Sequence, residues 1–172
     1  MDASPPLALP CPLEAGWEVV RTIELPRSHA DGRPMGGFSA AAYQREQDRL
    51  WLLSDAPIGH LISWGGLAPL LQGQQDTLRP GRRLLLKGAD GQPFPEGFDG
   101  EGLVLEGRQA WIASEGRRSS ERPARLIRID LGSGRLQQEL PLPQAWRATP
   151  GQGLGSNKGP ESLTALGPGD LL

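Results

Sequence analysis

The chain has 172 residues, a formal net charge of −2 and a pI of about 5.7. The length suggests one domain, and the nearly balanced charge excludes a bulk electrostatic attraction to nucleic acid. The 24 Gly and 17 Pro follow no triplet period, so they indicate many turns and few long helices.

The cysteine content and the N-terminal residues exclude further classes of protein. Cys11 is the only cysteine, so the chain has no internal disulfide and no cysteine cluster for zinc. No stretch is long and apolar enough to span a membrane. Residues 1–10 lack the basic region and the unbroken apolar core of a signal peptide, which leaves the compartment open. We expect residues 1–16 to be an irregular lead-in and residues 17–172 to form the folded domain.

The first part of the chain predicts five strands. Residues 17–25 alternate apolar and polar side chains up to Pro26 and predict a strand, followed by a polar loop that turns at Asp31-Gly32. No window shows helical periodicity, so no amphipathic helix is expected, and residues 65–81 are expected to be a loop. A unit of four strands is predicted at residues 38–43, 49–54, 59–64 and 82–87.

A second unit repeats this plan. Its four strands are predicted at residues 101–105, 109–114, 125–131 and 136–140, with a glycine-rich hairpin turn at 130–134. Pro141 stops the last strand, and a Gly/Pro loop leads to a third unit that begins at Asn157 and that we expect to be cut off by the end of the chain.

One pattern occurs at the start of each unit. A polar residue opens the first strand, at Ser39, Glu101 and Glu161, with separations of 62 and 60 residues. The second strand carries a Trp and ends on Ser plus a carboxylate, in the runs Trp51-Leu52-Leu53-Ser54-Asp55 and Trp111-Ile112-Ala113-Ser114-Glu115. Both Trp side chains are expected to pack inside the units.

A long period with several strands per unit is typical of a repeat architecture, most simply a β-propeller of four-stranded antiparallel blades. We therefore predict an all-β chain with about two blades and the start of a third. Because a propeller needs at least about four blades to close, we expect a fragment of a larger propeller, whose missing blades come from the remainder of the parent protein.

The predicted strand pairing brings acidic residues to one end of the units. Antiparallel neighbours place the start of one strand beside the end of the next, so Glu101 lies near Glu115 and Ser39 lies near Asp55. If the inner strands line a central axis, five carboxylates converge on one opening, here called the acidic mouth: Asp55, Asp99, Glu101, Glu115 and Glu161.

Carboxylates that face one another repel unless a cation or shared protons intervene. All-oxygen sites favour calcium or magnesium, and calcium tolerates irregular geometry. We therefore predict a metal site formed by the acidic mouth, with Asn157 as a neutral oxygen donor. The alternative is that these residues cap turns at the rim, for which Asp99-Gly100 is well suited.

The remaining polar residues give weaker indications of a functional site. Arg117 and Arg118 follow Glu115 and could hold an anionic substrate, or they could be solvated turn residues. His29 and His60 have no partner at metal-ligand spacing, so we expect both at the surface and assign no general base. The chain lacks a G-x-S-x-G elbow, a Walker A sequence and a dinucleotide fingerprint.

From about Gly36 to the C-terminus, these motifs resemble the phytase-like family, often described as "esterase-like activity of phytase". The resemblance rests on Gly37-Phe38-Ser39, Trp51 with Ser54-Asp55, Asp99-Gly100-Glu101-Gly102, Trp111 with Ser114-Glu115-Gly116, and Asn157-Lys158-Gly159-Pro160-Glu161-Ser162-Leu163. It implies a propeller with a calcium-binding acidic mouth that hydrolyses phosphomonoesters or carboxylesters. The family's proteins are longer and commonly carry export signals, whereas this sequence shows no such signal.

Three functions follow from these observations. In the first, calcium acts as template and Lewis acid for the hydrolysis of a small anionic or ester substrate. In the second, the same propeller and metal form a binding module without turnover, since a fold does not decide function. In the third, the chain is a truncated product without independent activity. None of the three predicts a nucleic-acid or membrane partner.

Overall fold

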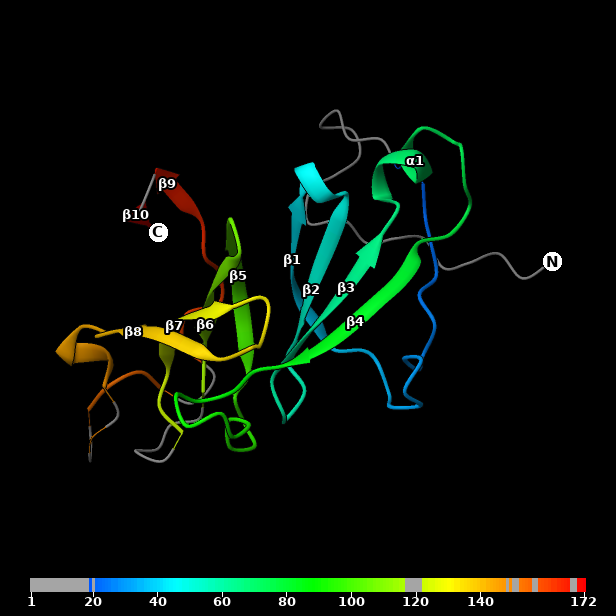
Figure 1. The fold of residues 1–172 in the computed structure, drawn as a ribbon. Coiled ribbons are helices and arrows are strands. Elements are labelled where there is room, and N and C mark those ends of the chain that lie inside the picture. The colour runs from blue at the N-terminus through cyan, green and yellow to red at the C-terminus, as the bar shows by residue number, and fades with distance from the viewer. Residues whose placement is uncertain are drawn as a thin grey trace.

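The computed structural model describes residues 19, 21–116, 122–147, 149, 152–155, 158–167 and 170–172. Their strands form three antiparallel sheets, two of four strands and one of two (Figure 1). The first sheet contains β1 (Phe38–Gln44), β2 (Arg49–Ser54), β3 (His60–Gly65) and β4 (Arg79–Leu85). The second contains β5 (Gly100–Glu106), β6 (Gln109–Ser114), β7 (Arg125–Asp130) and β8 (Leu136–Leu140), and the third contains β9 (Ala165–Gly167) and β10 (Asp170–Leu171). The all-β prediction is confirmed.

The predicted loop at residues 65–81 is wrong in two respects. It contains the short helix α1 (Leu67–Leu71), and β4 begins inside it at Arg79. The helix start is held by Asp48, whose carboxylate accepts hydrogen bonds from the Gly66 and Ala68 amides, both at 2.9 Å. Five residues are too few to show a helical repeat of apolar positions, so the sequence carries no periodic signal for α1.

The strand predicted at residues 17–25 is also wrong where the structure describes it. Residues 21–26 form no strand, and residues 17, 18 and 20 lie outside the described residues. Ile23 and Leu25 instead pack on the outer face of the first sheet. Their alternating apolar pattern therefore reflects burial on one side without a neighbouring strand.

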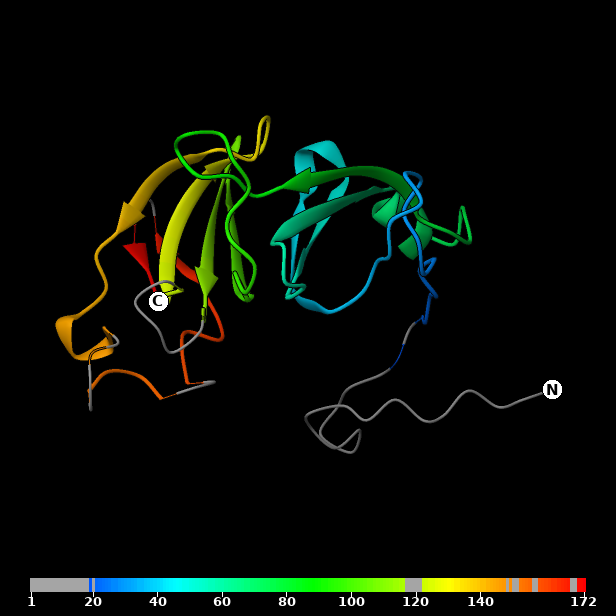
Figure 2. The ribbon, with the colours of Figure 1, turned by 90° about the horizontal axis from the view of Figure 1, so that it is seen from below.

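The two four-stranded sheets stand side by side, with β1 and β5 as neighbours between them (Figure 1, Figure 2). In each sheet the chain runs in sequence order from this inner strand to the outer one, β4 or β8. The described strands do not close into a ring. The sheets have the strand number and order of propeller blades, and the propeller remains an interpretation.

Both sheets share one irregularity between their first two strands. Phe38 pairs with Ser54 and Ala40 with Leu53, which leaves Ser39 as the extra residue of a bulge. Gly100 pairs with Ser114 and Gly102 with Ala113, which leaves Glu101 in the equivalent place. A bulge re-aims the side chain of its extra residue. Ser39 to Asp55 spans two residues more than Glu101 to Glu115, because four residues (45–48) join β1 to β2 and two (107–108) join β5 to β6.

The main hydrophobic core lies between the two sheets. Trp51, Leu53 and Leu61 of the first sheet and Ile112, Ile127 and Ile129 of the second belong to it, and all are buried. A second core on the outer face of the first sheet contains Leu52, Ile62, Trp64, Leu70 and Leu78.

The prediction that both repeated Trp side chains pack inside the sheets is confirmed. Trp51 is 1% exposed and lies in the core between the sheets. Trp111 is 6% exposed, lies under the Arg128 guanidinium and donates its Nε1–H to Glu106.

The C-terminal segment forms its own antiparallel pair, β9 with β10. Ahead of this pair, Leu163 lies close over Gly102, where an added Cβ would stand 2.8 Å from the Leu163 Cβ. The segment is thereby held against the second sheet. Among the described residues, no helix has the length and apolar character needed to cross a membrane.

Candidate functional site

The backbones of Asp55 and Glu115 are held in the same way at the ends of their strands. Asp55 follows β2 and its amide donates to the Gly37 carbonyl at 2.7 Å. Glu115 follows β6 and its amide donates to the Asp99 carbonyl at 2.8 Å. Gly37 and Asp99 both have positive φ, 58° and 55°, a conformation that favours Gly and is tolerated by Asp. The two sheets therefore present their terminal carboxylates from equivalent turns.

Gly37 is required by its contact with Asp55 as well as by its backbone. A Cβ at position 37 would lie 1.9 Å from Asp55 Oδ1, closer than any real contact. The carboxylate therefore packs directly over the glycine backbone.

The Ser residues of the repeated pattern hold these strand ends in place. The Ser54 hydroxyl donates to the Gly36 carbonyl at 2.9 Å, and the Ser114 hydroxyl donates to the Phe98 carbonyl. Both Ser residues are almost completely buried. Because each hydroxyl satisfies a carbonyl of the turn before the first strand, the Ser in each motif has a structural role.

Glu101 lies among the other predicted acidic residues. Burial raises the pKa of its carboxyl group, and the negative charges of Asp99, Asp55, Glu115 and Glu161 raise this pKa further. The structure therefore brings the other four carboxylates of the acidic mouth within electrostatic reach of Glu101. This is the arrangement that disfavours several simultaneous negative charges.

Glu115 is the most enclosed member of the acidic mouth. It is 8% exposed, and its Oε1 accepts a hydrogen bond from the Gly159 amide at 2.9 Å. A Cβ at position 159 would lie 2.6 Å from Glu115 Cγ. One oxygen of Glu115 thus holds the segment that leads to Glu161.

The donor chemistry of the acidic mouth fits calcium, since carboxylate oxygens are the ligands that calcium prefers. The described residues nevertheless contain no group of three or more His, Cys, Asp or Glu side chains arranged to hold a metal ion. The carboxylates share one region without forming a complete ligand set. Asn157, Arg117 and Arg118 lie outside the described residues.

The expectation that His60 lies at the surface is wrong, because this residue is only 2% exposed. His60 opens β3 directly opposite Ser54, the last residue of β2. Its Nδ1 lies 2.9 Å from the Ile58 carbonyl oxygen, and burial lowers the pKa of its imidazole. The strand-pairing argument that places Glu101 beside Glu115 also places the start of β3 beside the end of β2. The predicted strands therefore indicated that His60 lies beside Ser54.

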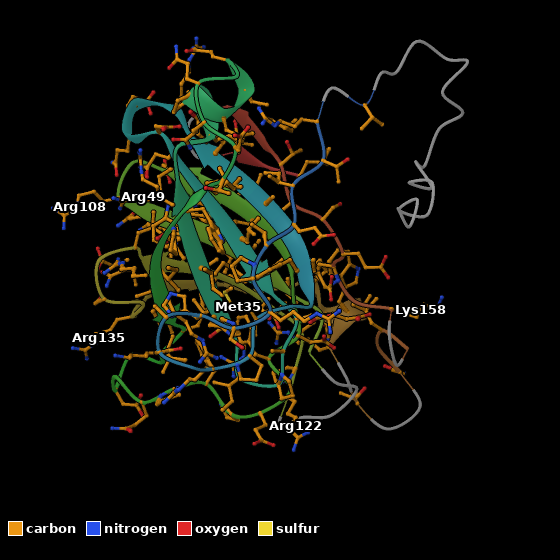
Figure 3. All side chains as sticks on the ribbon, turned by 90° about the vertical axis from the view of Figure 1, so that its right-hand side faces the viewer. Met35, Arg49, Arg108, Arg122, Arg135 and Lys158 are labelled. Atoms are coloured by element: carbon orange, nitrogen blue, oxygen red, sulfur yellow. The ribbon has the colours of Figure 1, made fainter. Side chains whose placement is uncertain are left out.

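A cavity of about 520 Å³ lies beside the acidic mouth. We call it the flank cavity; its lining includes Met35, Asp55, Ile58, His60, Arg83 and Glu96. Asp55 belongs both to this cavity and to the acidic mouth. Figure 3 shows Met35 near one end of the first sheet, with Arg49 and Arg108 toward the other end. The flank cavity thus opens at the end of the first sheet where β2 ends and β3 begins.

The chain matches the sequence model of a known protein family. The sequence model of the phytase-like family, described as "Esterase-like activity of phytase", matches residues 33–172, which is most of the chain. No curated protein matches the chain.

Proposed function

Because the chain belongs to the phytase-like family, we propose that it is a hydrolase-like domain that binds calcium at the acidic mouth and cleaves phosphomonoesters or carboxylesters there. The observation that supports this proposal is the environment of Glu101, whose pKa is raised by burial and by four neighbouring carboxylates. A cation bound among these groups would relieve their repulsion.

Residues from both sheets and from the C-terminal segment would hold the cation. Asp55, Asp99, Glu101 and Glu161 would offer carboxylate oxygens, Glu115 would offer the oxygen that Gly159 does not use, and Asn157 a neutral oxygen. Calcium would supply positive charge that polarises the ester. The protein would position the substrate, and Arg117 and Arg118, which lie outside the described residues, remain candidates for this role.

Thermal unfolding of the chain in EDTA and then in calcium tests the metal site. A ligand that binds the folded state raises the unfolding midpoint, so we expect a clear increase with calcium that Glu101→Gln largely removes. Glu46→Gln is the matched control, because Glu46 lies in the turn between β1 and β2, away from the acidic mouth. A cooperative transition that does not respond to calcium would contradict the metal site.

Hydrolysis of chromogenic phosphate and acetate esters tests the reaction. We expect turnover that requires calcium and that decreases in Glu101→Gln. Calcium stabilisation without turnover of either ester would instead favour a metal-containing binding module. The absence of a cooperative transition would contradict independent activity of this chain.

A further inference from the structure

Arg83 lies in the wall of the flank cavity and forms no ion pair with another described residue. It lies on β4 opposite Ile62, at the outer face of the first sheet. Its Nε and Nη1 atoms are buried and have no hydrogen-bond partner among the described residues. Asp31 stabilises its charge only through space, and Arg33 opposes it. A partly buried guanidinium with unsatisfied donors is costly, and an anion would recover that cost.

His60 does not supply the missing partner. Its Nδ1 lies 2.9 Å from the Ile58 carbonyl oxygen and 3.4 Å from Arg83 Nη2. A carbonyl only accepts hydrogen bonds, so the shorter contact makes Nδ1 a donor and leaves no lone pair for the guanidinium. Nε2 is then an unprotonated acceptor, and it too has no partner among the described residues. Arg83 is therefore the positive charge of the cavity, beside a neutral ring with one free acceptor.

We propose that the flank cavity binds an oxoanion group, a phosphate or a carboxylate, through Arg83. Guanidinium groups bind both anions by charge-assisted hydrogen bonds. The His60 imidazole packs against Arg83 and acts as a positioning residue. In this arrangement Arg83 orients the anionic part of a ligand whose other end reaches Asp55 and the acidic mouth.

The carboxylates of Asp55 and Glu96 line the same cavity, and they oppose the binding of an anion in the absence of a cation. Here the inference rests on the proposed function, because calcium at the acidic mouth would neutralise this charge. We therefore expect the anion to bind more tightly when calcium is present, with Arg83 and calcium at opposite sides of the ligand.

Isothermal titration of the full chain with inorganic phosphate, and separately with acetate, tests the proposal. Each titration is done in EDTA and in calcium below the concentration at which calcium phosphate precipitates. We expect phosphate or acetate to bind to the wild type, and Arg83→Gln to weaken that binding about tenfold or more. Arg79→Gln removes the same charge from the exposed start of β4 and serves as the control. Binding of phosphate but not acetate would identify the bound group as a phosphate. Binding of acetate but not phosphate would identify it as a carboxylate.

Unchanged binding in Arg83→Gln would overturn the proposal, as would a wild type that binds neither anion. If Arg83→Gln does not fold, Arg83→Lys keeps the charge with fewer donors, and we expect it to bind the anion with intermediate affinity. Arg83-dependent binding without ester hydrolysis would leave the subsite in place and reject the proposed reaction. Calcium-dependent ester hydrolysis without Arg83-dependent anion binding would reject the subsite and leave the proposed function in place.

Discussion

The Gly159 amide donates a 2.9 Å hydrogen bond to Oε1 of Glu115, which joins the second sheet to the C-terminal segment. Glu115 ends the repeated strand pattern, and Gly159 stands two residues before Glu161. The bond therefore couples the place of the third acidic segment to the carboxylate of the second sheet. It also consumes one of the oxygens that the acidic mouth could offer to a cation.

Gly159→Ala should disturb this junction. The added Cβ would stand 2.6 Å from Glu115 Cγ and 2.7 Å from its Cα, so either the segment or the carboxylate must move. We expect a loss of about 1–3 kcal/mol in the free energy of unfolding, typical of overpacking, measured by urea denaturation. Gly167→Ala is the control, because an added Cβ there meets nothing within 4 Å. Equal urea midpoints for the two variants would contradict the close contact.

Glu101 should make the protein less stable as the pH rises. Its folded-state pKa is raised above the ordinary 4.5 by burial and by the surrounding carboxylates, so the folded chain binds this proton more readily than the unfolded chain. The free energy of unfolding should then fall from about pH 4.5 up through the folded pKa and level off above it. Glu101→Gln should lack this decline and be more stable than the wild type at neutral pH in EDTA.

Unfolding curves recorded in EDTA across pH 4 to 8 check this behaviour. Parallel profiles for the wild type and Glu101→Gln would show that the carboxyl group is not perturbed. Added calcium should reverse the order at neutral pH if the acidic mouth binds it, because only the wild type retains the carboxylate.

His60 should have the opposite effect on stability. Burial lowers the pKa of its imidazole below 6.5, so the unfolded chain takes up this proton first as the pH falls. The contribution of the neutral imidazole to the free energy of unfolding should therefore be fully present above pH 6.5. It should decrease as the pH falls from 6.5 toward the folded pKa. Urea midpoints across this window should fall less in His60→Gln than in the wild type. The same pH dependence in both proteins would argue against a neutral buried ring, and His29→Gln provides the comparison.

Leu53→Ala tests the core between the sheets. Leu53 is fully buried, and Gly100 of the second sheet packs against its side chain. We expect a loss of about 2–5 kcal/mol, the usual cost of a buried Leu→Ala cavity. Leu71→Ala, at a side chain that is 59% exposed, should change stability by less than about 0.5 kcal/mol. Similar values for both variants would show that the two sheets do not share this core.

Sequence patterns predicted the second sheet well. The strands at 109–114 and 136–140 match β6 and β8, and 49–54 matches β2 in the first sheet. Alternating apolar residues between strong turn residues carry this information locally. Helix α1 was not predicted because its start depends on hydrogen bonds to Asp48, a residue from a different turn. Such a contact between distant residues produces no periodic pattern in the sequence.

The all-β class, the strand order within each unit and the position of acidic residues at strand ends could all be predicted from the amino-acid sequence, because side-chain alternation and turn chemistry act between near neighbours. The folded structure was needed to show that burial raises the pKa of Glu101, that His60 is buried, and that Arg83 lines a cavity shared with Asp55. These features depend on burial and on charges from distant segments. Burial and long-range charge follow from how the sheets pack, and no short stretch of sequence contains that packing.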